Sequence, residues 1–575
     1  SKPKFSVDVY QGITQLTKVP DLADGIEYMN AVNEAYNNSY GKAYYSQQYI
    51  TNTKVANGLP TPELTSEQRA ELESQRSINK YLYPNVDWMR ELYHKYGWNR
   101  RVNLNIRGGA PNANYYISLS YYQEKGLTKT DPTQDYSTEI DYNRYNFLTN
   151  VNLKATKMTN IDVGVSGYFA SGNYPNRSLN DIYTRAMNTN PVIYPVQYPN
   201  GENPGYSQVQ RELDNPWVEL TRRGYQTQYN TQVNSNLKIT QDLGFWDWSK
   251  GLTARALVAF DVRATQTLSY SVDNSTWKPS GSKDPTTGDT WLDDGNLYDE
   301  NGNIKLQEEF KGNTTMSFKS DKWVYRTFYF EAALDYKHTF AKRHNVSGLV
   351  VFNIRNYRDA NGDLIGSLPH KQESLSARAT YDYDNRYFVE ANLGYTGSEN
   401  FAKGHRFGTF PAWAIGWVPS NEGWWKPVSH VISFLKLRYS DGTVGNDSQN
   451  GRFGYFTEIT GKSGYSSYWG TDGIGYNKYG FQAQWSKIRK QDLGIEINFL
   501  HDDLTFVFDL FKERRTKIFV DRNNLPLLAG FAATASANVG IVKNKGYEIA
   551  LEYSHQFGKD LFVSVRGNIT ENTDK

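Results

Sequence analysis

The short motifs that could bind phosphate or a metal are incomplete. Gly461-Lys462-Ser463 ends like a phosphate-binding loop, but such a loop needs a glycine five residues before Gly461, where this chain has Phe456. Asp299-Glu-Asn-Gly302-Asn303 and Asp359-Ala-Asn-Gly362-Asp363 begin like calcium loops but lack the full set of acidic positions and the closing glutamate. We predict a polar loop at Gly461-Lys462-Ser463. Because Asn and Gly tolerate positive φ, we predict turns at the other two segments, with no metal and no cofactor.

Catalytic chemistry has equally little support. The 8 histidines are scattered without an HExxH pair, and no nucleophile-elbow motif marks a serine. Cysteine is absent, which excludes disulfides and thiolate metal sites and leaves the compartment open. We therefore expect a protein that is not an enzyme.

Four aromatic residues are the candidates for substrate binding. Tyr465, Tyr468, Trp469 and Tyr476 lie in a segment that is rich in Gly and Ser and has few charges. Flat rings beside small polar residues suit stacking on sugar faces or contacts with a peptide, so we predict that these four contact substrate. The same rings could instead pack the loop or bind a partner protein.

The elements that must position these side chains are β-strands. Residues 371–446 contain four successive segments in which apolar and polar residues alternate, as from Leu375 to Tyr383. Alternation with a period of two gives a strand one apolar and one polar face. Such a sheet suits a water-soluble protein, and it equally suits a membrane barrel with lipid outside and a wet lumen.

This alternation runs nearly from end to end and predicts about 17 strands, with boundaries uncertain by a few residues. Besides the four central strands, we expect strands near residues 4–14, 98–108, 113–125, 141–154, 159–171, 226–241, 251–268, 323–339, 344–357, 485–499, 504–516, 545–557 and 560–571. Trp323, Tyr325, Trp413 and Trp417 fall at strand ends, where aromatic residues form the interfacial girdles of membrane barrels.

The connections between the strands alternate between long and short. An outer-membrane barrel has tight periplasmic turns at one end and long extracellular loops at the other, whereas a soluble sandwich has no reason to keep this order. The pattern therefore favours a transmembrane antiparallel β-barrel, with its long loops at the extracellular end. Those loops cover residues 15–97, 173–225, 270–322 and 442–482. Within the first loop, helical patterns occur near 22–38, 65–77 and 86–95, and Thr65 is a plausible helix cap.

Composition and the absence of repeats argue against several other classes of protein. The formal net charge is +2, from 63 basic and 61 acidic residues, so we predict no nucleic-acid partner. No stretch approaches the roughly 18 apolar residues of a spanning helix. A soluble carbohydrate-binding or hydrolytic β protein, such as a propeller, would need internal repeats of roughly 40 to 50 residues, and none is evident. An enzymatic outer-membrane barrel would need a catalytic cluster, which we do not find.

A series of motifs in the same order resembles one family, the SusC-like (SusC/RagA) TonB-dependent transporters of Bacteroidetes outer membranes. The motifs are Leu82-Tyr-Pro-Asn-Val-Asp-Trp88, Tyr115-Tyr-Ile-Ser-Leu-Ser-Tyr121, Arg386-Tyr387, Arg406-Phe-Gly-Thr-Phe-Pro-Ala-Trp413, Leu435-Lys-Leu-Arg438 with Gly445-Asn446, and Asn544-Lys-Gly-Tyr-Glu548. One departure is Thr396-Gly-Ser-Glu-Asn400, where the family has an acidic DGSS turn. The resemblance covers nearly all of residues 1–575.

The resemblance implies a function and partners. It implies TonB-dependent import of oligosaccharides across the outer membrane, with oligopeptide import by the same mechanism as the alternative. The implied partners are a SusD-like surface lipoprotein that covers the extracellular mouth, the TonB complex, and outer-membrane lipid. The family has a plug in a barrel of about 22 strands. Since we count about 17, we expect residues 1–575 to be part of the barrel, with the plug before residue 1 and about five strands after residue 575.

The last strands allow a specific prediction about orientation. Tyr547, Ile549, Leu551 and Tyr553 alternate with Glu548, Ala550 and Glu552. We expect the first set to face lipid and the second set to face the lumen, because one face carries large apolar or amphipathic groups and the other carries carboxylates.

Overall fold

The computed structural model describes residues 2–205, 215–313, 315–362, 366–447, 452–467, 470–478, 480 and 483–521, and 536–575. Seventeen strands form the main sheet: β1 (Lys4–Thr14), β2 (Gly97–Ala110), β3 (Ala113–Lys125), β4 (Asp141–Lys154), β5 (Thr159–Pro175), β6 (Gly224–Asp242), β7 (Leu252–Ser271), β10 (Ser317–Phe340), β11 (His344–Asp359), β12 (His370–Tyr383), β13 (Tyr387–Ser398), β14 (Phe407–Trp417), β15 (Ile432–Asn446), β18 (Ser486–Phe499), β19 (Leu504–Asp521), β20 (Ser536–Phe557) and β21 (Leu561–Asp574).

Shorter elements occupy the connections. The helices are α1 (Gly25–Tyr40), α2 (Gln47–Ala56), α3 (Ser66–Ser74), α4 (Trp88–Leu92), α5 (Leu179–Asn188) and α6 (Pro216–Thr221), with 3-10 turns η2 (Asp247–Ser249), η3 (Pro419–Asn421) and η4 (Gly423–Trp425). Two hairpins stand outside the main sheet: β8 (Thr276–Pro279) with β9 (Leu306–Phe310), and β16 (Glu458–Ser467) with β17 (Gly470–Lys478). No helix among the described residues is both long and apolar enough to cross a bilayer.

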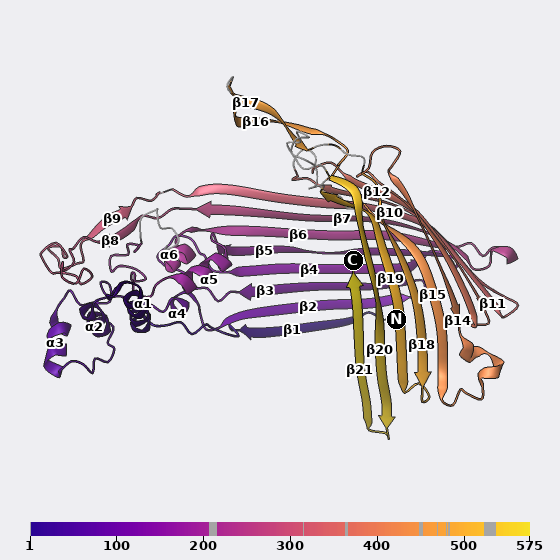
Figure 1. The fold of residues 1–575 in the computed structure, drawn as a ribbon, viewed down its shortest axis with the longest axis horizontal. Helices are drawn as coiled ribbons and strands as arrows, with labels where there is room; N and C mark the ends of the chain where they lie inside the picture. The colour runs from indigo at the N-terminus through magenta and orange to yellow at the C-terminus, as the bar shows by residue number, and fades with distance from the viewer. Residues whose placement is uncertain are drawn as a thin grey trace.

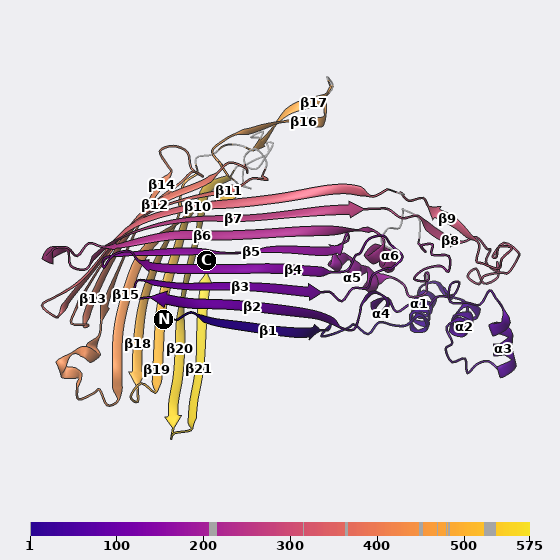
Figure 2. The same ribbon diagram turned by 180° about the vertical axis from the view of Figure 1, so that it is seen from behind.

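The main sheet is an antiparallel meander. Each strand pairs with the next one in the chain, from β1–β2 through β7–β10 and β15–β18 to β20–β21. The sheet curls strongly, so that β1 to β7 run across the view of Figure 1 while β18 to β21 run from top to bottom, and Figure 2 shows the same curvature from behind. No pairing joins β1 to β21 within their described residues, so these two strands are the edges of an open, curved wall. The prediction of about 17 barrel strands is confirmed.

The cross-strand register gives this wall one apolar and one polar face. Residues that lie opposite one another share a face. One row on the apolar face passes through Leu334, Val350, Ala377 and Leu393. A row on the polar face passes through Glu331, Asn353, Ser374 and Thr396. Exposed members of the apolar face include Val7, Val102, Leu119, Tyr145, Val163, Leu237, Val258, Leu334, Val350, Leu375, Leu393, Trp413, Leu493, Leu510, Leu551 and Val565.

An exposed apolar face that extends around the whole wall fits a lipid environment. Soluble monomers rarely expose contiguous apolar patches above a few hundred Å². Here one face of the entire sheet is apolar, while the other presents amides, hydroxyls and charges. This is the alternation of a membrane barrel, with lipid on one side and water on the other.

Tight turns occur where the sequence predicts them. Asp384 and Asn385 have φ of 53° and 55° between β12 and β13, and Ala341 and Lys342 take the same left-handed conformation between β10 and β11. The alternation of long and short connections is broken at one point. Residues 418–431, at the tight-turn end, contain η3 and η4 and form a longer connection than residues 399–406 at the other end.

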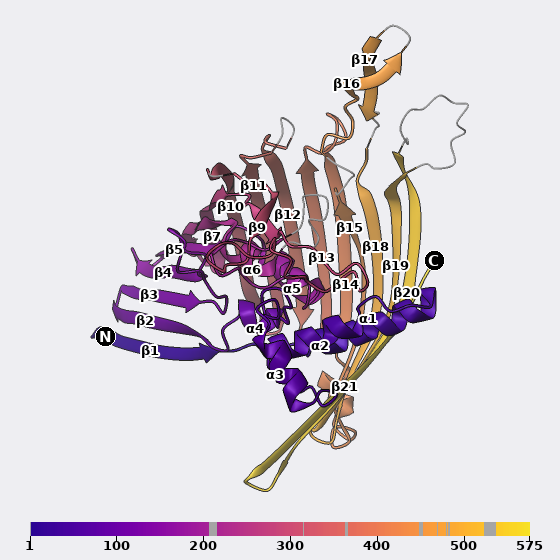
Figure 3. The ribbon, with the colours of Figure 1, turned by 90° about the vertical axis from the view of Figure 1, so that its left-hand side faces the viewer.

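Three long connections fold together into a structure that we call the cap, formed by the described residues 15–96, 176–205 with 215–223, and 272–313 with 315–316. One apolar core joins α1 and α2 to Val192 and Leu297, and a second joins α4 and α5 to Tyr194 and Leu220. The cap lies beyond the ends of β1 to β7 in Figures 1 and 2, and its helices stand in front of the sheet in Figure 3. The long connections of this region are therefore packed protein rather than separate loops.

Some boundaries differ from the sequence predictions. Helix α2 and the strands β8, β9, β16 and β17 fall in segments that the alternation pattern assigned to irregular structure. Strand β20 begins at Ser536 rather than near 545, because a register shift beside Ile518 interrupts the regular pairing with β19 and hides the alternation. Register also corrects two girdle assignments, since Trp323 and Tyr325 lie on the polar face, in the same strand parity as Glu331.

Candidate functional site

The polar face of the wall carries networks of ion pairs. Arg438 on β15 contacts Asp492 at 3.0 Å and Glu496 at 3.2 Å, and it also contacts Asp509 on β19. Arg378 pairs with Glu390 at 2.7 Å, from β12 to β13. Paired charges of both signs suit a hydrated interior and leave no strong net field of either sign.

Aromatic rings also line the polar face toward the cap end. Tyr325 stacks on Tyr357 with centroids 6.1 Å apart, and Tyr357 contacts His370 at 5.4 Å. Nearby, Arg452 pairs with Glu399 at 2.6 Å. The sequence contains part of the signal for this cluster, because the alternation within each strand puts Tyr325 and Tyr357 on its polar side. The register then shows that the two side chains share one face of the sheet.

A second aromatic cluster joins two connections to the polar face. Phe401 is fully buried, and its ring lies 5.1 Å from that of Trp485, which in turn contacts Phe410 of β14 at 5.2 Å. The Trp485 indole N–H donates to the backbone oxygen of Arg406 at 3.0 Å. These contacts hold the start of β18 against β14, and their rings occupy space on the polar side of the wall.

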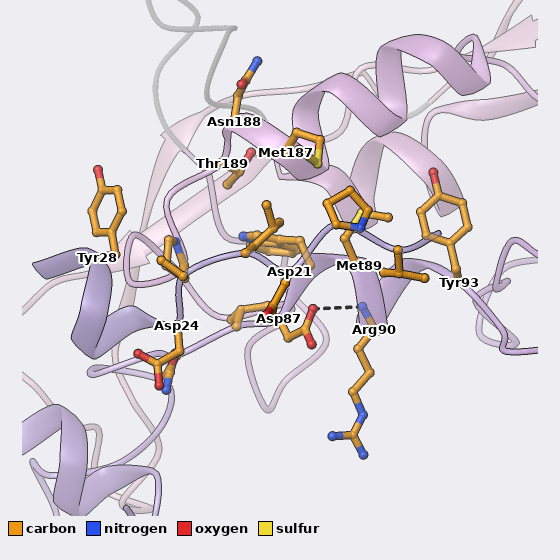
Figure 4. A pocket seen from close by; sticks show the side chains of 18 of the residues that line it. Asp21, Asp24, Tyr28, Asp87, Met89, Arg90, Tyr93, Met187, Asn188 and Thr189 are labelled. Carbon is orange, nitrogen blue, oxygen red and sulfur yellow. Dashed lines mark hydrogen bonds between the residues drawn. The ribbon is translucent and has the colours of Figure 1, made fainter. Parts of the chain in front are cut away.

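A cavity of about 910 Å³ lies in the cap, shown in Figure 4. Its wall combines the segment that follows β1, helix α4 with the residues before it, and the end of α5. The lining residues include Asp21, Asp24, Tyr28, Asp87, Trp88, Met89, Arg90, Tyr93, Met187 and Thr189. Its volume lies within the roughly 300–1,000 Å³ of small-molecule sites.

Helix caps hold two of the three carboxylates at this cavity. Asp24 accepts hydrogen bonds from the backbone N–H groups of Ile26 and Glu27, both at 2.9 Å. Asp87 accepts one from Arg90 N–H at 3.1 Å, the dashed line in Figure 4. Each thereby satisfies free N–H groups at the start of a helix, α1 or α4. Asp21, by contrast, receives no hydrogen bond or ion pair from the described residues.

The cavity also contains hydrogen-bonding groups without partners. The indole N–H of Trp88, which is 2% exposed, and the hydroxyl of Thr189, which is 6% exposed, have no hydrogen-bond partner among the described residues. Burial raises the pKa of the Tyr28 and Tyr93 hydroxyls, so both stay protonated at neutral pH. Rings, hydroxyls and a free carboxylate together suit the binding of a neutral polyhydroxylated molecule.

The four predicted substrate residues lie in a different place. Tyr465 belongs to β16 and Tyr476 to β17, in a hairpin that projects away from the main sheet in Figures 1 and 3. Tyr468 and Trp469 lie outside the described residues. The role predicted for these four residues stays a prediction. Sequence reasoning missed the cap cavity, although the N-cap residues Asp24 and Asp87 mark the helices that enclose it.

The short motifs resolve as turns and strands. Gly461-Lys462-Ser463 runs within β16, paired with β17, and so has no strand-to-helix geometry. The Asp299 carboxylate accepts from the backbone N–H groups of Asn301 and Asn303 at 2.9 and 2.8 Å. Asp359 accepts from Asn361 N–H at 2.9 Å. Local backbone groups thus satisfy these carboxylates, as the turn interpretation predicted.

Comparison with known proteins finds TonB-dependent receptors that are similar to this chain. No family model matches the chain. TonB-dependent receptor P39 of Formosa agariphila is 23% identical over 534 residues, which cover 87% of this chain. TonB-dependent receptor SusC of Bacteroides thetaiotaomicron is 28% identical over 203 residues, 35% of this chain and 20% of SusC. These matches agree with the resemblance to SusC-like TonB-dependent transporters found in the sequence motifs.

The fold agrees with that assignment. A solved structure of the RagAB peptide importer in the "closed-closed" state superposes on all of this SusC-like chain with a TM-score of 0.68 at 17% identity. This chain spans 45% of the length of receptor P39 and 61% of the matched RagAB chain. The SusC-like chain is thus an outer-membrane β-barrel protein, and its relatives are named as receptors and transporters rather than enzymes.

Proposed function

We propose that this chain forms the wall of a TonB-dependent importer that takes up oligosaccharides across the outer membrane together with a SusD-like surface lipoprotein. The observation that carries the proposal is the two-faced sheet, in which a continuous apolar surface backs a hydrated face of paired charges and aromatic rings. Such a wall separates lipid from a water-filled passage and needs no covalent chemistry. Energy would reach the importer from the inner membrane through TonB.

The cap supports a role in substrate entry. Hydrogen bonds and an ion pair join its three connections: Ser46 N–H donates to Asp289 at 2.7 Å, Arg76 pairs with Asp293 at 2.7 Å, and Val86 N–H donates to the backbone oxygen of Pro191 at 2.9 Å. A packed surface at the long-connection end offers a rigid platform for a lipoprotein lid. We place this end, and with it the connections at 15–97, 173–225, 270–322 and 442–482, outside the cell.

The contents of the cap cavity favour a sugar over a charged ligand. The rings of Tyr28 and Tyr93 offer flat apolar surfaces, and the Asp21 carboxylate offers an acceptor for sugar hydroxyls, beside the cations Arg90 and Lys95 that also line the cavity. We assign the cavity as a subsite for one sugar unit near the mouth. Tyr465, Tyr468, Trp469 and Tyr476 remain proposed contacts for the rest of the oligosaccharide.

Oligopeptide import is the second candidate. It is favoured by the superposition of the whole chain on a structure whose title names a peptide importer. The paired charges of both signs on the polar face would equally suit a zwitterionic peptide backbone.

The test is uptake by cells that carry variants at the chromosomal locus. Radiolabelled oligosaccharides and oligopeptides are supplied to the wild type, a TonB-deletion strain and an Asp21→Asn strain. We expect oligosaccharide uptake to require TonB and to fall about tenfold in Asp21→Asn, the cost of one charge-assisted hydrogen bond. Glu300→Gln, on an exposed cap turn away from the cavity, is the matched control. TonB-dependent uptake of peptides alone would overturn the substrate class, and uptake independent of TonB would overturn the mechanism.

A further inference from the structure

Five exposed cations gather on the apolar side of the wall, at its long-connection end. We call this group the basic patch: Arg489 on β18, Lys512 and Arg514 on β19, and Lys543 and Lys545 on β20. Arg489, Arg514 and Lys543 lie directly opposite one another in a single cross-strand row. Lys512 and Lys545 form a pair in the row beneath. The patch therefore shares a face with the apolar residues Leu510 and Leu551, and its five charged side chains are exposed.

Few carboxylates neutralise the basic patch. Arg489 pairs with Asp441 at 2.5 Å, and Glu571 on the same face accepts from the Tyr547 hydroxyl at 2.6 Å. The other four cations of the patch form no ion pair among the described residues. On the polar face at the same height, by contrast, Lys490 pairs with Glu513 at 3.3 Å, and Arg515 contacts that same carboxylate.

Repulsion among the cations of the basic patch destabilises the isolated protein. Like charges directly opposite each other across strands destabilise a sheet. A row of three cations is therefore expected only where an external anion compensates them. Because the patch lies on the apolar side, that anion must reach it from the lipid side of the wall.

Its height matches the headgroup level of a bilayer. Below the patch, the lipid-side face of β20 runs from Tyr547 to Phe557, with His555 near its lower end, roughly 33 Å along the strand at 3.3 Å per residue. With a strand tilt of about 40°, this segment is about 25 Å tall, the height of the apolar band of an outer-membrane barrel. Lys545 and Lys543 follow immediately above the band, where lipid phosphates lie.

A second group of cations repeats this arrangement elsewhere on the wall. Arg326 on β10 lies opposite Arg358 on β11, above Phe328 on the apolar side. Lys371 on β12 is adjacent, in the row of Asn356. Within the described residues neither arginine forms an ion pair. The recurrence on the apolar side of strands far apart in the sheet indicates anionic groups at more than one place around the wall rather than a single local ligand.

We propose that the basic patch binds the phosphate groups of a phosphorylated glycolipid in the outer leaflet of the outer membrane. Charge complementarity and height both favour such a lipid. A second copy of the chain would present the same cations and would add repulsion. Nucleic acid would have to displace lipid from the apolar residues directly below. The proposal rests on the orientation given above, with the long connections outside the cell.

The test titrates full-length protein, purified in detergent, with lipid A and counts bound lipids by native mass spectrometry. Each cation near an anionic membrane surface contributes about fivefold in affinity. The triple variant Lys512→Gln, Arg514→Gln, Lys543→Gln should therefore bind lipid A about a hundredfold more weakly, and Lys545→Gln alone about fivefold more weakly. Lys490→Gln, which removes a cation of the polar face at the same height, should bind like the wild type.

Further titrations separate the sources of the anion. Dephosphorylated lipid A should bind weakly to every variant, and inorganic phosphate should not compete at the concentrations of lipid A used. Equal binding by the triple variant and the wild type would overturn the proposal, as would an equal loss in Lys490→Gln. A preference for phosphatidylglycerol over lipid A would assign the patch to the other leaflet. Loss of dimers in the triple variant without loss of lipid would assign it to a contact between copies. Uptake of sugar or peptide is not measured, so this outcome is independent of the proposed function.

Discussion

Replacing Leu551 by arginine tests the assignment of the two faces. Leu551 is 47% exposed and shares its row with Phe506 and Gly567. It lies roughly 20 Å along β20 from Phe557, which at a tilt of about 40° is about 15 Å into an apolar band of about 25 Å. An arginine so close to the midplane should destabilise the folded barrel by about 2–4 kcal/mol, a factor of about 30 to 1,000 in the folding equilibrium.

Ala550→Arg is the matched control, one residue away on the polar face. There the new guanidinium would lie between Glu548 and Glu552 on the same strand, on the side where we expect water. We expect it to cost less than about 1 kcal/mol. The full-length protein is folded into phosphocholine vesicles and unfolded with guanidinium chloride, with heat-modified gel mobility reporting the folded fraction. If both variants unfold at the same denaturant concentration, the assignment of Leu551 to lipid is wrong.

Contacts of the cap allow three further predictions. Asp131, in the connection between β3 and β4, forms a buried pair with Arg222 of the cap at 2.7 Å. Asp131→Asn leaves that guanidinium uncompensated and should destabilise the contact by about 3 kcal/mol; hydrogen exchange of residues 126–140 reports the loss. Burial alone would raise the pKa of Asp131, but hydrogen bonds from Thr133 and Arg222 outweigh it and lower that pKa. The resulting stability is present above the unfolded pKa of about 3.9 and is lost as the pH falls through the lower folded value, so hydrogen exchange in the cap should accelerate only below about pH 4. Arg76→Ala, which breaks an exposed pair with Asp293, should leave hydrogen exchange in the cap unchanged in the same assay, and faster exchange would contradict the view that this contact is screened by water.

Strand alternation predicted most of the wall because each strand keeps one face in lipid and one in water. The segments at 113–125 and 141–154 coincide with β3 and β4, and the turn at Asp384 and Asn385 has the positive φ that its residue types favour. The prediction of strand boundaries failed where the alternation is too short or is interrupted. Strand β8 is too short to show a period, and β20 carries a register shift near its start.

The sequence by itself determined which residues alternate, where the tight turns fall and which family the motifs resemble, since these depend on neighbours within a few positions. Only the tertiary structure decided what depends on contacts between distant segments. The pairing of the strands shows that Trp323 lies on the polar face. It also shows that Arg489, Arg514 and Lys543 lie in one row. The cap cavity joins the segment after β1 to the end of α5, and no local pattern encodes that packing. Side-chain periodicity is local, but pairing between strands and packing between loops are not.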